Sequence, residues 1–285
     1  MRWFARPEPA LAELLGGDGN LKPFPGEHAV DAFGLRIAVG SSVPEMRGRV
    51  AAVLPPGATP CRPNEIQLRF GIARVGDMFQ VVGPISDVLW SRDPALAESI
   101  LAAMVGRALA QFAPEWVFLR AESAIHEGRA ILVAGPSMSG KSILLAALAE
   151  AGAQPFSDVY TAIGADGLLH VYRPHAARDG ALARGEAGWE PRPVPVKAVV
   201  ITDYRPGATW SAAPQSPASA TIQLLQFAAT DPKRVQEALA AVSRLAAQAT
   251  VFTGPRGEAH EVVSGLLGND GMGFPSQCSR SGLAG

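Results

Sequence analysis

The chain has 285 residues, a length that predicts one large domain or two of modest size. Hydrophobic residues make up 48% and charged residues 18%, which is the balance of a globular protein with a core. The formal net charge is −1, which excludes a global basic field that would draw the protein onto nucleic acid or an anionic membrane.

The cysteines and the apolar runs indicate the cellular compartment of the protein. Cys61 and Cys278 fit no metal-ligand spacing, and we expect no structural disulfide between them. The first residues hold no uninterrupted apolar run of signal-peptide length, and no stretch approaches the ~20 apolar residues of a membrane span. We therefore expect a soluble, cytoplasmic protein.

Residues 1–112 are expected to form a β-rich subdomain with one helix. Short apolar runs separated by Gly and Pro predict strands of a small, mostly antiparallel sheet at 33–40, 49–56, 65–76 and 78–84. Residues 93–112 change to helical spacing, with Asp93 as the N-cap and Pro94 in the first turn.

Residues 113–268 are expected to form a second domain, and residues 269–285, rich in Gly and Ser, a disordered tail. Apolar runs predict strands at 115–123, 129–135, 154–164, 166–174, 196–204 and 250–254. Helical spacing predicts helices at 141–151, 216–230, 231–248 and 258–268, with Asp231 capping the third. Gly, Pro and Ala dominate 175–195, which predicts a long loop that is either functional or disordered.

The segment GPSMSGKS, residues 135–142, has the spacing G-x-x-x-x-G-K-S and lies between an apolar strand and a helix. In that context backbone N–H groups wrap nucleotide phosphates, and the helix N-terminus adds a favourable dipole. Lys141 is expected to reach the β- and γ-phosphates, and Ser142 is expected to bind Mg²⁺. The expected nucleotide-binding residues are Gly135, Pro136, Ser137, Met138, Ser139, Gly140, Lys141, Ser142 and Ile143.

Phosphoryl transfer also needs an acid near the metal and the acceptor hydroxyl, and two Asp residues follow predicted strands. Asp158 comes soon after the loop helix, and Asp203 follows four apolar residues and a Thr, as in a Walker B strand. The residues alone slightly favour Asp203, although each of the two also fits an ordinary Asp that caps a strand end.

The order of these elements resembles the catalytic core of the HPr kinase/phosphorylase-like proteins. Residues 128–174 share the family's glycine-rich loop, its short helix, its strand ending in SDD or SDE, and its hairpin ending in a basic residue and Pro; residues 33–267 match more loosely. The resemblance implies a phosphoenolpyruvate-carboxykinase-like variant of the P-loop fold, an α/β mixed sheet with few covering helices. It also implies ATP and Mg²⁺ as cofactors, a homo-oligomer, and Asp158 as the acid that serves the metal and the acceptor hydroxyl.

The chain departs from the family pattern near the expected site. Val159 follows Asp158 where the family has a second acid, and Arg120 stands where the family has a His. Arg cannot act as a base near neutral pH, but it can clamp a phosphate, so Arg120 is a candidate substrate contact. Arg173 is another, because the family keeps a basic residue there, and Glu186 is a candidate second metal ligand.

Three functions fit this pattern. The first is an ATP- and Mg²⁺-dependent kinase, with Lys141 and Asp158 as catalytic residues, that phosphorylates a hydroxyl: a serine of a peptide or small protein, or a small molecule. The second is a nucleotide-binding regulatory or assembly protein that has lost kinase activity. The third is an ATPase of the Walker A and B type that uses Asp203. No motif separates ATP from GTP or pyrophosphate as the donor, and we expect no nucleic-acid or membrane partner.

Overall fold

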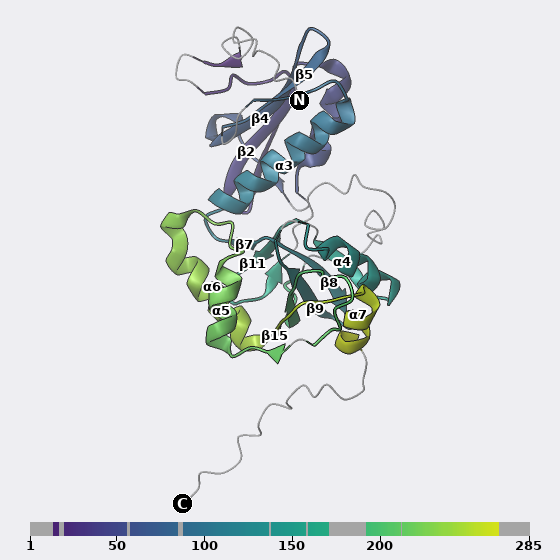
Figure 1. The fold of residues 1–285 in the computed structure, drawn as a ribbon. Helices are drawn as coiled ribbons and strands as arrows, with labels where there is room; N and C mark the ends of the chain where they lie inside the picture. The colour runs from purple at the N-terminus through teal and green to yellow at the C-terminus, as the bar shows by residue number, and fades with distance from the viewer. Residues whose placement is uncertain are drawn as a thin grey trace, which may run out of the picture.

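The computed structural model describes residues 14–16, 20–55, 58–84, 88–136, 138–157, 159–170, 192–211 and 213–267. They form two lobes, one from the N-terminal and one from the C-terminal part of the chain (Figure 1). The expected tail at 269–285 and most of the expected loop at 175–195 lie outside the described residues.

The first lobe is built on a six-stranded sheet with the strand order β3-β1-β2-β4-β5-β6. Among the described residues every neighbouring pair is antiparallel except β2 with β4, so the predicted, mostly antiparallel sheet is confirmed. The strands are β1 (His28–Ala32), β2 (Leu35–Ser41), β3 (Thr59–Pro60), β4 (Leu68–Val75), β5 (Met78–Val82) and β6 (Leu89–Ser91).

The predicted strand at 49–56 is wrong, because the chain there folds into helical turns. Met46, Val50 and Val53 are all buried against the sheet. Their spacing is that of one helix face and not the alternation of a strand. The turns are η1 (Pro44–Met46), α2 (Arg47–Val50) and η2 (Ala51–Val53), and a further turn, η3 (Pro63–Glu65), precedes β4.

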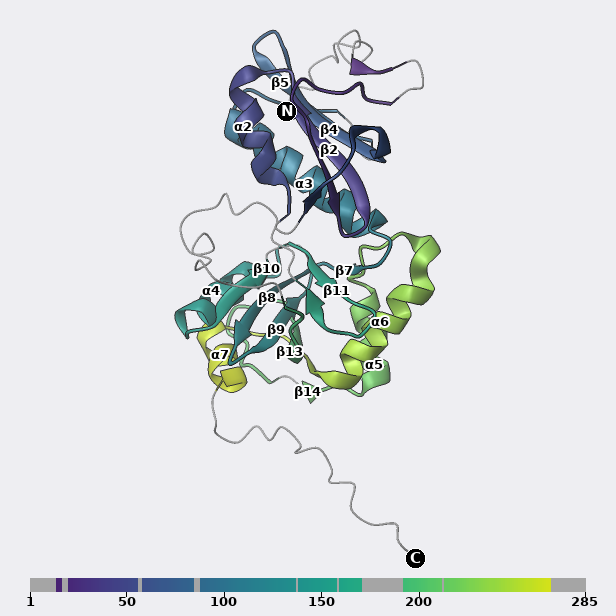
Figure 2. The ribbon, with the colours of Figure 1, turned by 180° about the vertical axis from the view of Figure 1, so that it is seen from behind.

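Helix α3 (Pro94–Phe112) covers one face of this sheet (Figures 1 and 2). Its predicted N-cap is confirmed, since the Asp93 side chain accepts a hydrogen bond from the N–H of Ala95. Among the described helices, α3 alone is long and apolar enough to cross a membrane. However, 56% of that stretch is buried inside the lobe, as in the core helix of a soluble protein.

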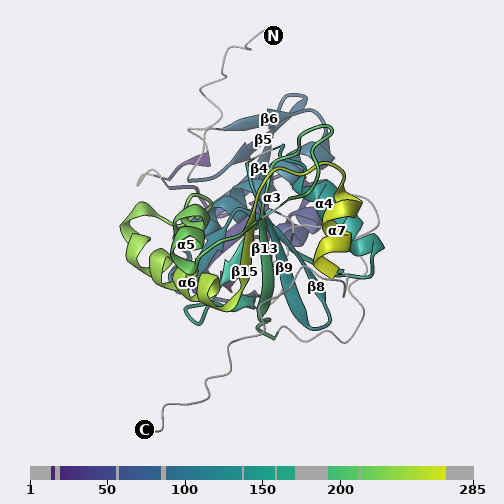
Figure 3. The ribbon, with the colours of Figure 1, turned by 60° about the horizontal axis from the view of Figure 1, so that its bottom comes forward.

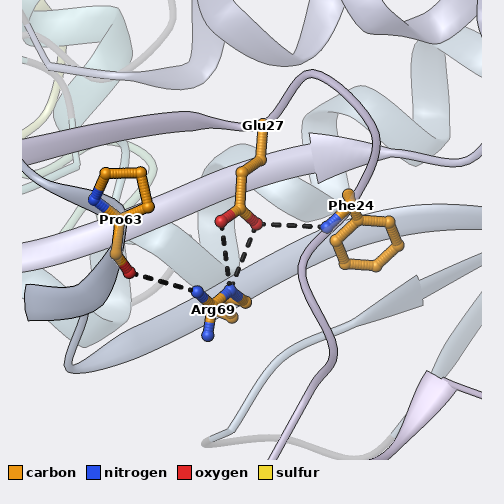
Figure 4. Close-up of polar contacts among 4 residues, drawn as sticks. All are labelled: Phe24, Glu27, Pro63 and Arg69. Atoms are coloured by element: carbon orange, nitrogen blue, oxygen red, sulfur yellow. Dashed lines mark hydrogen bonds and ion pairs between the residues drawn. The ribbon is translucent and has the colours of Figure 1, made fainter.

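The opposite face of the sheet is covered by the segment that leads into β1. Phe24 lies over two strand glycines, Gly40 and Gly71, where an added Cβ would come within 2.5 Å and 2.3 Å of the Phe24 side chain. The Glu27 carboxylate accepts a hydrogen bond from Nε of Arg69 at 3.1 Å and from the N–H of Phe24 at 3.1 Å (Figure 4). This largely buried ion pair fixes the segment to β4.

The second lobe holds a six-stranded sheet of mixed direction, with the strand order β10-β8-β9-β13-β15-β14. The pairs β9–β13 and β13–β15 are parallel, whereas β10–β8, β8–β9 and β14–β15 are antiparallel. The protein is therefore of the mixed α/β class, as predicted. The strands are β8 (Ala121–His126), β9 (Arg129–Ala134), β10 (Gln154–Ser157), β13 (Val196–Ile201), β14 (Ala213–Pro214) and β15 (Thr250–Thr253).

Helices cover both faces of this sheet, so the second lobe has three layers (Figure 3). Helices α4 and α7 pack on one face, and α5 and α6 pack on the other. Asp231 is an N-cap as predicted, since its side chain accepts a hydrogen bond from the N–H of Lys233 in the turn before α6. Helix α5 ends earlier than predicted, because the N–H of Ala229 donates to the carbonyl of Phe118. The helices are α4 (Lys141–Glu150), α5 (Pro217–Leu225), α6 (Val235–Gln248), which follows the turn η4 (Pro232–Arg234), and α7 (Ala259–Leu267).

A three-stranded sheet with the order β12-β11-β7 joins the two lobes (Figure 2). Phe118 and Ala162 pack into the core of the first lobe, whereas Val117, Leu119 and Ile163 pack into the core of the second. Successive residues of the same strands therefore face different cores, and this alternation ties the lobes together. The strands are β7 (Val117–Leu119), β11 (Thr161–Ile163) and β12 (Leu169–His170).

Two predicted strands are divided between sheets. Residues 115–123 form β7 and then β8, with a break at Arg120, whose backbone N–H donates to the carbonyl of Phe227 at 2.8 Å. Residues 154–164 likewise form β10 and then β11. At each break the chain passes from one sheet to the other, between the small joining sheet and the large sheet. The local sequence does not encode this change of sheet.

Candidate nucleotide-binding site

The glycine-rich loop leaves the carboxyl end of β9 and enters α4 at Lys141, so the predicted strand and helix flank it. Gly140 has a φ of 80°, a left-handed conformation that glycine adopts without strain. Gly135 is required for space, because an added Cβ would lie 2.7 Å from both Ser139 Oγ and the carbonyl oxygen of Thr202. The loop is thus a tight turn against the end of β13.

The remaining loop residues differ in exposure. Ser139 is buried, whereas Met138 and Ile143, the latter in α4, are exposed. Ser137 lies outside the described residues.

The Lys141 side chain folds back over the loop. Its ammonium donates to the carbonyl oxygens of Gly135 at 3.1 Å and Pro136 at 2.7 Å. Burial lowers the pKa of the Lys141 ammonium, and the negative charge of Glu122 partly opposes that shift. A phosphate group at the loop would favour the charged form of this lysine.

Glu122 is a candidate residue that the sequence reasoning missed. It lies on β8 opposite Val133 of β9, and its Oε1 accepts a hydrogen bond from the Ser142 hydroxyl at 2.8 Å. Glu122 is only 7% exposed although its side chain is ionisable. The available signal was a single acid in the otherwise uncharged run AESAI, on a strand that the short EGR turn connects to the loop strand.

A chain of buried hydroxyl groups borders the segment that contains Asp158. The Ser157 hydroxyl lies 2.6 Å from the Ser123 hydroxyl and 2.6 Å from the Thr161 hydroxyl, which in turn donates to the carbonyl of Ala121 at 2.9 Å. These bonds join β10 and β11 to the strand that carries Glu122. Asp158 itself lies outside the described residues.

Asp203, the alternative acid, follows the carboxyl end of β13, the parallel neighbour of β9. Its Oδ2 accepts a hydrogen bond from Nε of Arg205 at 2.9 Å, and both side chains are largely solvent-exposed. The position is that of a Walker B acid, but the carboxylate is paired with Arg205. The Ser142 hydroxyl donates its hydrogen bond to Glu122 instead.

Of the two arginines predicted to contact the substrate, the structure describes only Arg120. Arg120 is exposed and directly precedes Ala121, which pairs with Ala134 at the start of the glycine-rich loop. Its backbone is therefore at the loop end of the sheet. Arg173 and Glu186 lie outside the described residues.

Arg256 is a second residue that the sequence reasoning missed. It is only 1% exposed, and it donates from Nη2 to the carbonyl of Gly140 at 2.7 Å and from Nη1 to the carbonyl of Gly257 at 3.0 Å. Its guanidinium also lies over the Tyr204 ring, with Cζ 5.5 Å from the ring centroid. Burial lowers the pKa of the Arg256 guanidinium. No local motif marks this arginine, because the contact depends on how the loop after β15 packs.

The site combines two cations, Lys141 and Arg256, with a hydroxyl and a carboxylate, Ser142 and Glu122. The cations and the N-terminus of α4 suit an anion, and the two oxygen groups suit Mg²⁺. Within the described residues, no cluster of three or more His, Cys, Asp or Glu side chains forms a protein-only metal site. Mg²⁺ in phosphate sites uses few protein ligands, so this pair is compatible with it.

Comparison with models of known protein families gives no match, and comparison with curated protein sequences gives none either.

Proposed function

We propose that the protein is an ATP- and Mg²⁺-dependent kinase that transfers the γ-phosphoryl group to a hydroxyl. The observation that carries the proposal is the loop between β9 and α4, with Lys141 folded over it and the Ser142 hydroxyl hydrogen-bonded to a buried carboxylate. Cations, backbone donors and a metal-binding hydroxyl are the groups that phosphoryl transfer requires.

In the proposed reaction the loop and Lys141 hold the phosphates of ATP, and bound Mg²⁺ neutralises their charge. The acceptor oxygen forms a bond to the γ-phosphorus, while the bond from that phosphorus to the β–γ bridging oxygen breaks and releases ADP. Asp158 takes the proton of the acceptor hydroxyl. Arg120 and Arg173 are proposed to contact the substrate.

The proposed acceptor is a serine of a peptide or small protein, as the resemblance to HPr kinase-like proteins implies, and the proposed location is the cytoplasm. The mixed sheet, in which antiparallel β8 and parallel β13 flank β9, supports the phosphoenolpyruvate-carboxykinase-like arrangement. We propose a homo-oligomer on the same resemblance.

A second candidate is a nucleotide-binding protein without kinase activity. It is favoured by Val159, an exposed apolar residue where the resemblance places a second acid. The Walker-type ATPase is less favoured, because Asp203 is held by Arg205.

The test is incubation of the purified protein with Mg²⁺ and γ-labelled ATP, with and without a lysate of the source organism. We expect a labelled protein or metabolite that disappears in Lys141→Ala and Asp158→Asn but persists in Asp203→Asn. Tight nucleotide binding with no transfer of label would favour the non-catalytic candidate. Loss of ATP hydrolysis in Asp203→Asn alone would favour the ATPase.

A further inference from the structure

Glu122 occupies an unusual position for a glutamate. It lies in the interior of β8, and its side chain is on the face of the sheet that packs against α4, since its register partner Val133 packs there with Leu144. Burial of a carboxylate is unfavourable unless cations or hydrogen-bond donors compensate for it. The buried Glu122 side chain accepts a hydrogen bond from Ser142, the residue at the entry of α4, and this contact makes it a candidate for a functional role.

The spacing of the two oxygen atoms fits a shared metal ion. Glu122 Oε1 and Ser142 Oγ are 2.8 Å apart. Two adjacent ligands of an octahedral Mg²⁺, each about 2.0–2.1 Å from the metal, lie about 2.9 Å apart. Little movement is needed for both oxygens to bind one ion.

The charged groups around Glu122 also fit a bound metal ion. Lys141 is the first residue of α4 and directly precedes Ser142, which donates to Glu122. The carboxylate and the ammonium therefore both lie at the glycine-rich loop. Asp203 is committed to Arg205, and Glu258 accepts a hydrogen bond from the Tyr204 hydroxyl at 3.3 Å.

We propose that Glu122 is a ligand of the Mg²⁺ that accompanies the nucleotide, together with Ser142. In this role it replaces the second acid that the resemblance places at position 159, where this chain has Val159. The inference rests on the proposed function, because it requires a nucleotide at the glycine-rich loop. It assigns to β8 a metal ligand that the kinase pattern would have placed in the segment after β10.

The test measures metal-dependent binding and not turnover. Calorimetry gives the affinity for a non-hydrolysable ATP analogue in Mg²⁺ and in EDTA, and electron paramagnetic resonance gives the affinity for Mn²⁺ in the presence of the analogue. In Glu122→Gln the amide oxygen can still accept from Ser142, so we expect the affinity in EDTA to be unchanged. The Mg²⁺-dependent gain and the Mn²⁺ affinity should fall at least about tenfold.

A matched control and a rescue make the result specific. Glu258→Gln removes a nearby carboxylate outside the pair and should leave the Mg²⁺-dependent gain intact. Adding Val159→Asp to Glu122→Gln returns an acid to the exposed position 159 and should restore part of the Mn²⁺ affinity. If Glu122→Gln fails to fold, as judged by circular dichroism, Glu122→Asp replaces it and should also weaken Mn²⁺ binding.

The outcomes separate the two proposals. Full Mg²⁺-dependent gain in Glu122→Gln, or in Glu122→Asp where it is the variant used, overturns the role of Glu122 and leaves the kinase proposal standing. Absence of nucleotide binding by the unaltered protein, in Mg²⁺ and in EDTA, overturns the proposed function and this inference with it.

Discussion

The guanidinium of Arg256 donates from Nη2 to the carbonyl oxygen of Gly140 at 2.7 Å, at the point where the glycine-rich loop becomes α4. The same oxygen accepts from the N–H of Leu144 at 3.2 Å. Because the N–H of a trans peptide points away from its C=O, these bonds also fix the direction of the Lys141 N–H. Arg256 is thus a positioning residue for the backbone of the glycine-rich loop.

Substitution of Arg256 should lower both nucleotide affinity and stability. Arg256→Met keeps the apolar stem but removes the charge and both hydrogen bonds, so we expect affinity for the ATP analogue to fall about tenfold. The melting temperature should also fall, because the buried carbonyl of Gly257 loses its donor. Calorimetry and thermal unfolding measure the two effects. Arg205→Met is the matched control at an exposed arginine, and equal affinities of the two variants would contradict the prediction.

The hydrogen-bonded hydroxyl groups beside the Asp158 segment are expected to contribute to the stability of the protein. Ser157→Ala removes a buried hydroxyl that bonds to both Ser123 and Thr161, and should lower the free energy of unfolding by about 1–3 kcal/mol. Urea denaturation measures the change. Ser99→Ala on the exposed side of α3 removes only a bond to its own helix, to the carbonyl of Ala95, and should stay within about 0.5 kcal/mol. A similar change in the free energy of unfolding of both variants would argue against a stabilising role of the buried hydroxyl groups.

The local elements of this fold could be predicted from the sequence, and the long-range contacts could not. The start of α3 could be predicted from a capping residue and a proline in the first turn, and the start of α4 from the glycine-rich loop before it. All of these signals act within a few residues. The break at Arg120 depends instead on the carbonyl of Phe227, more than a hundred residues away along the chain. Such pairings are set by the packing of the lobes.

The candidate site shows the same division. The positions of Lys141 and Ser142 follow from a contiguous motif, whereas Glu122 reaches the loop through the antiparallel register of β8 with β9. Arg256 reaches it through the loop after β15. Glu122 has one local signal, a single acid on a strand that a short turn connects to the loop strand, whereas Arg256 has none. Knowledge of the strand register would have been needed to pair Glu122 with Ser142.

The packing of Phe24 on the first sheet predicts an intolerance to added volume. In Gly71→Ala the new Cβ would lie 2.3 Å from the Phe24 ring, so the ring must move, and we expect a loss of about 1–3 kcal/mol in the free energy of unfolding. Chemical denaturation measures the loss. Gly48→Ala has open space around the new Cβ and should be neutral or stabilising by up to about 1 kcal/mol. Combining Gly71→Ala with Phe24→Leu should give less than the sum of the two losses, and full additivity would contradict the contact.

The pKa of Lys141 predicts a pH dependence of nucleotide binding. Burial lowers the pKa of this ammonium below the ordinary lysine value, and bound phosphates would raise it, so binding should take up protons at pH values between these two pKa values. Affinity should be full below the pKa of the free protein and should weaken as the pH rises from that value toward the higher pKa of the complex. Calorimetry in two buffers of different ionisation enthalpy measures the uptake. Lys141→Arg keeps the charge at all accessible pH values, so it should remove this dependence. An unchanged pH profile in Lys141→Arg would show that another group titrates.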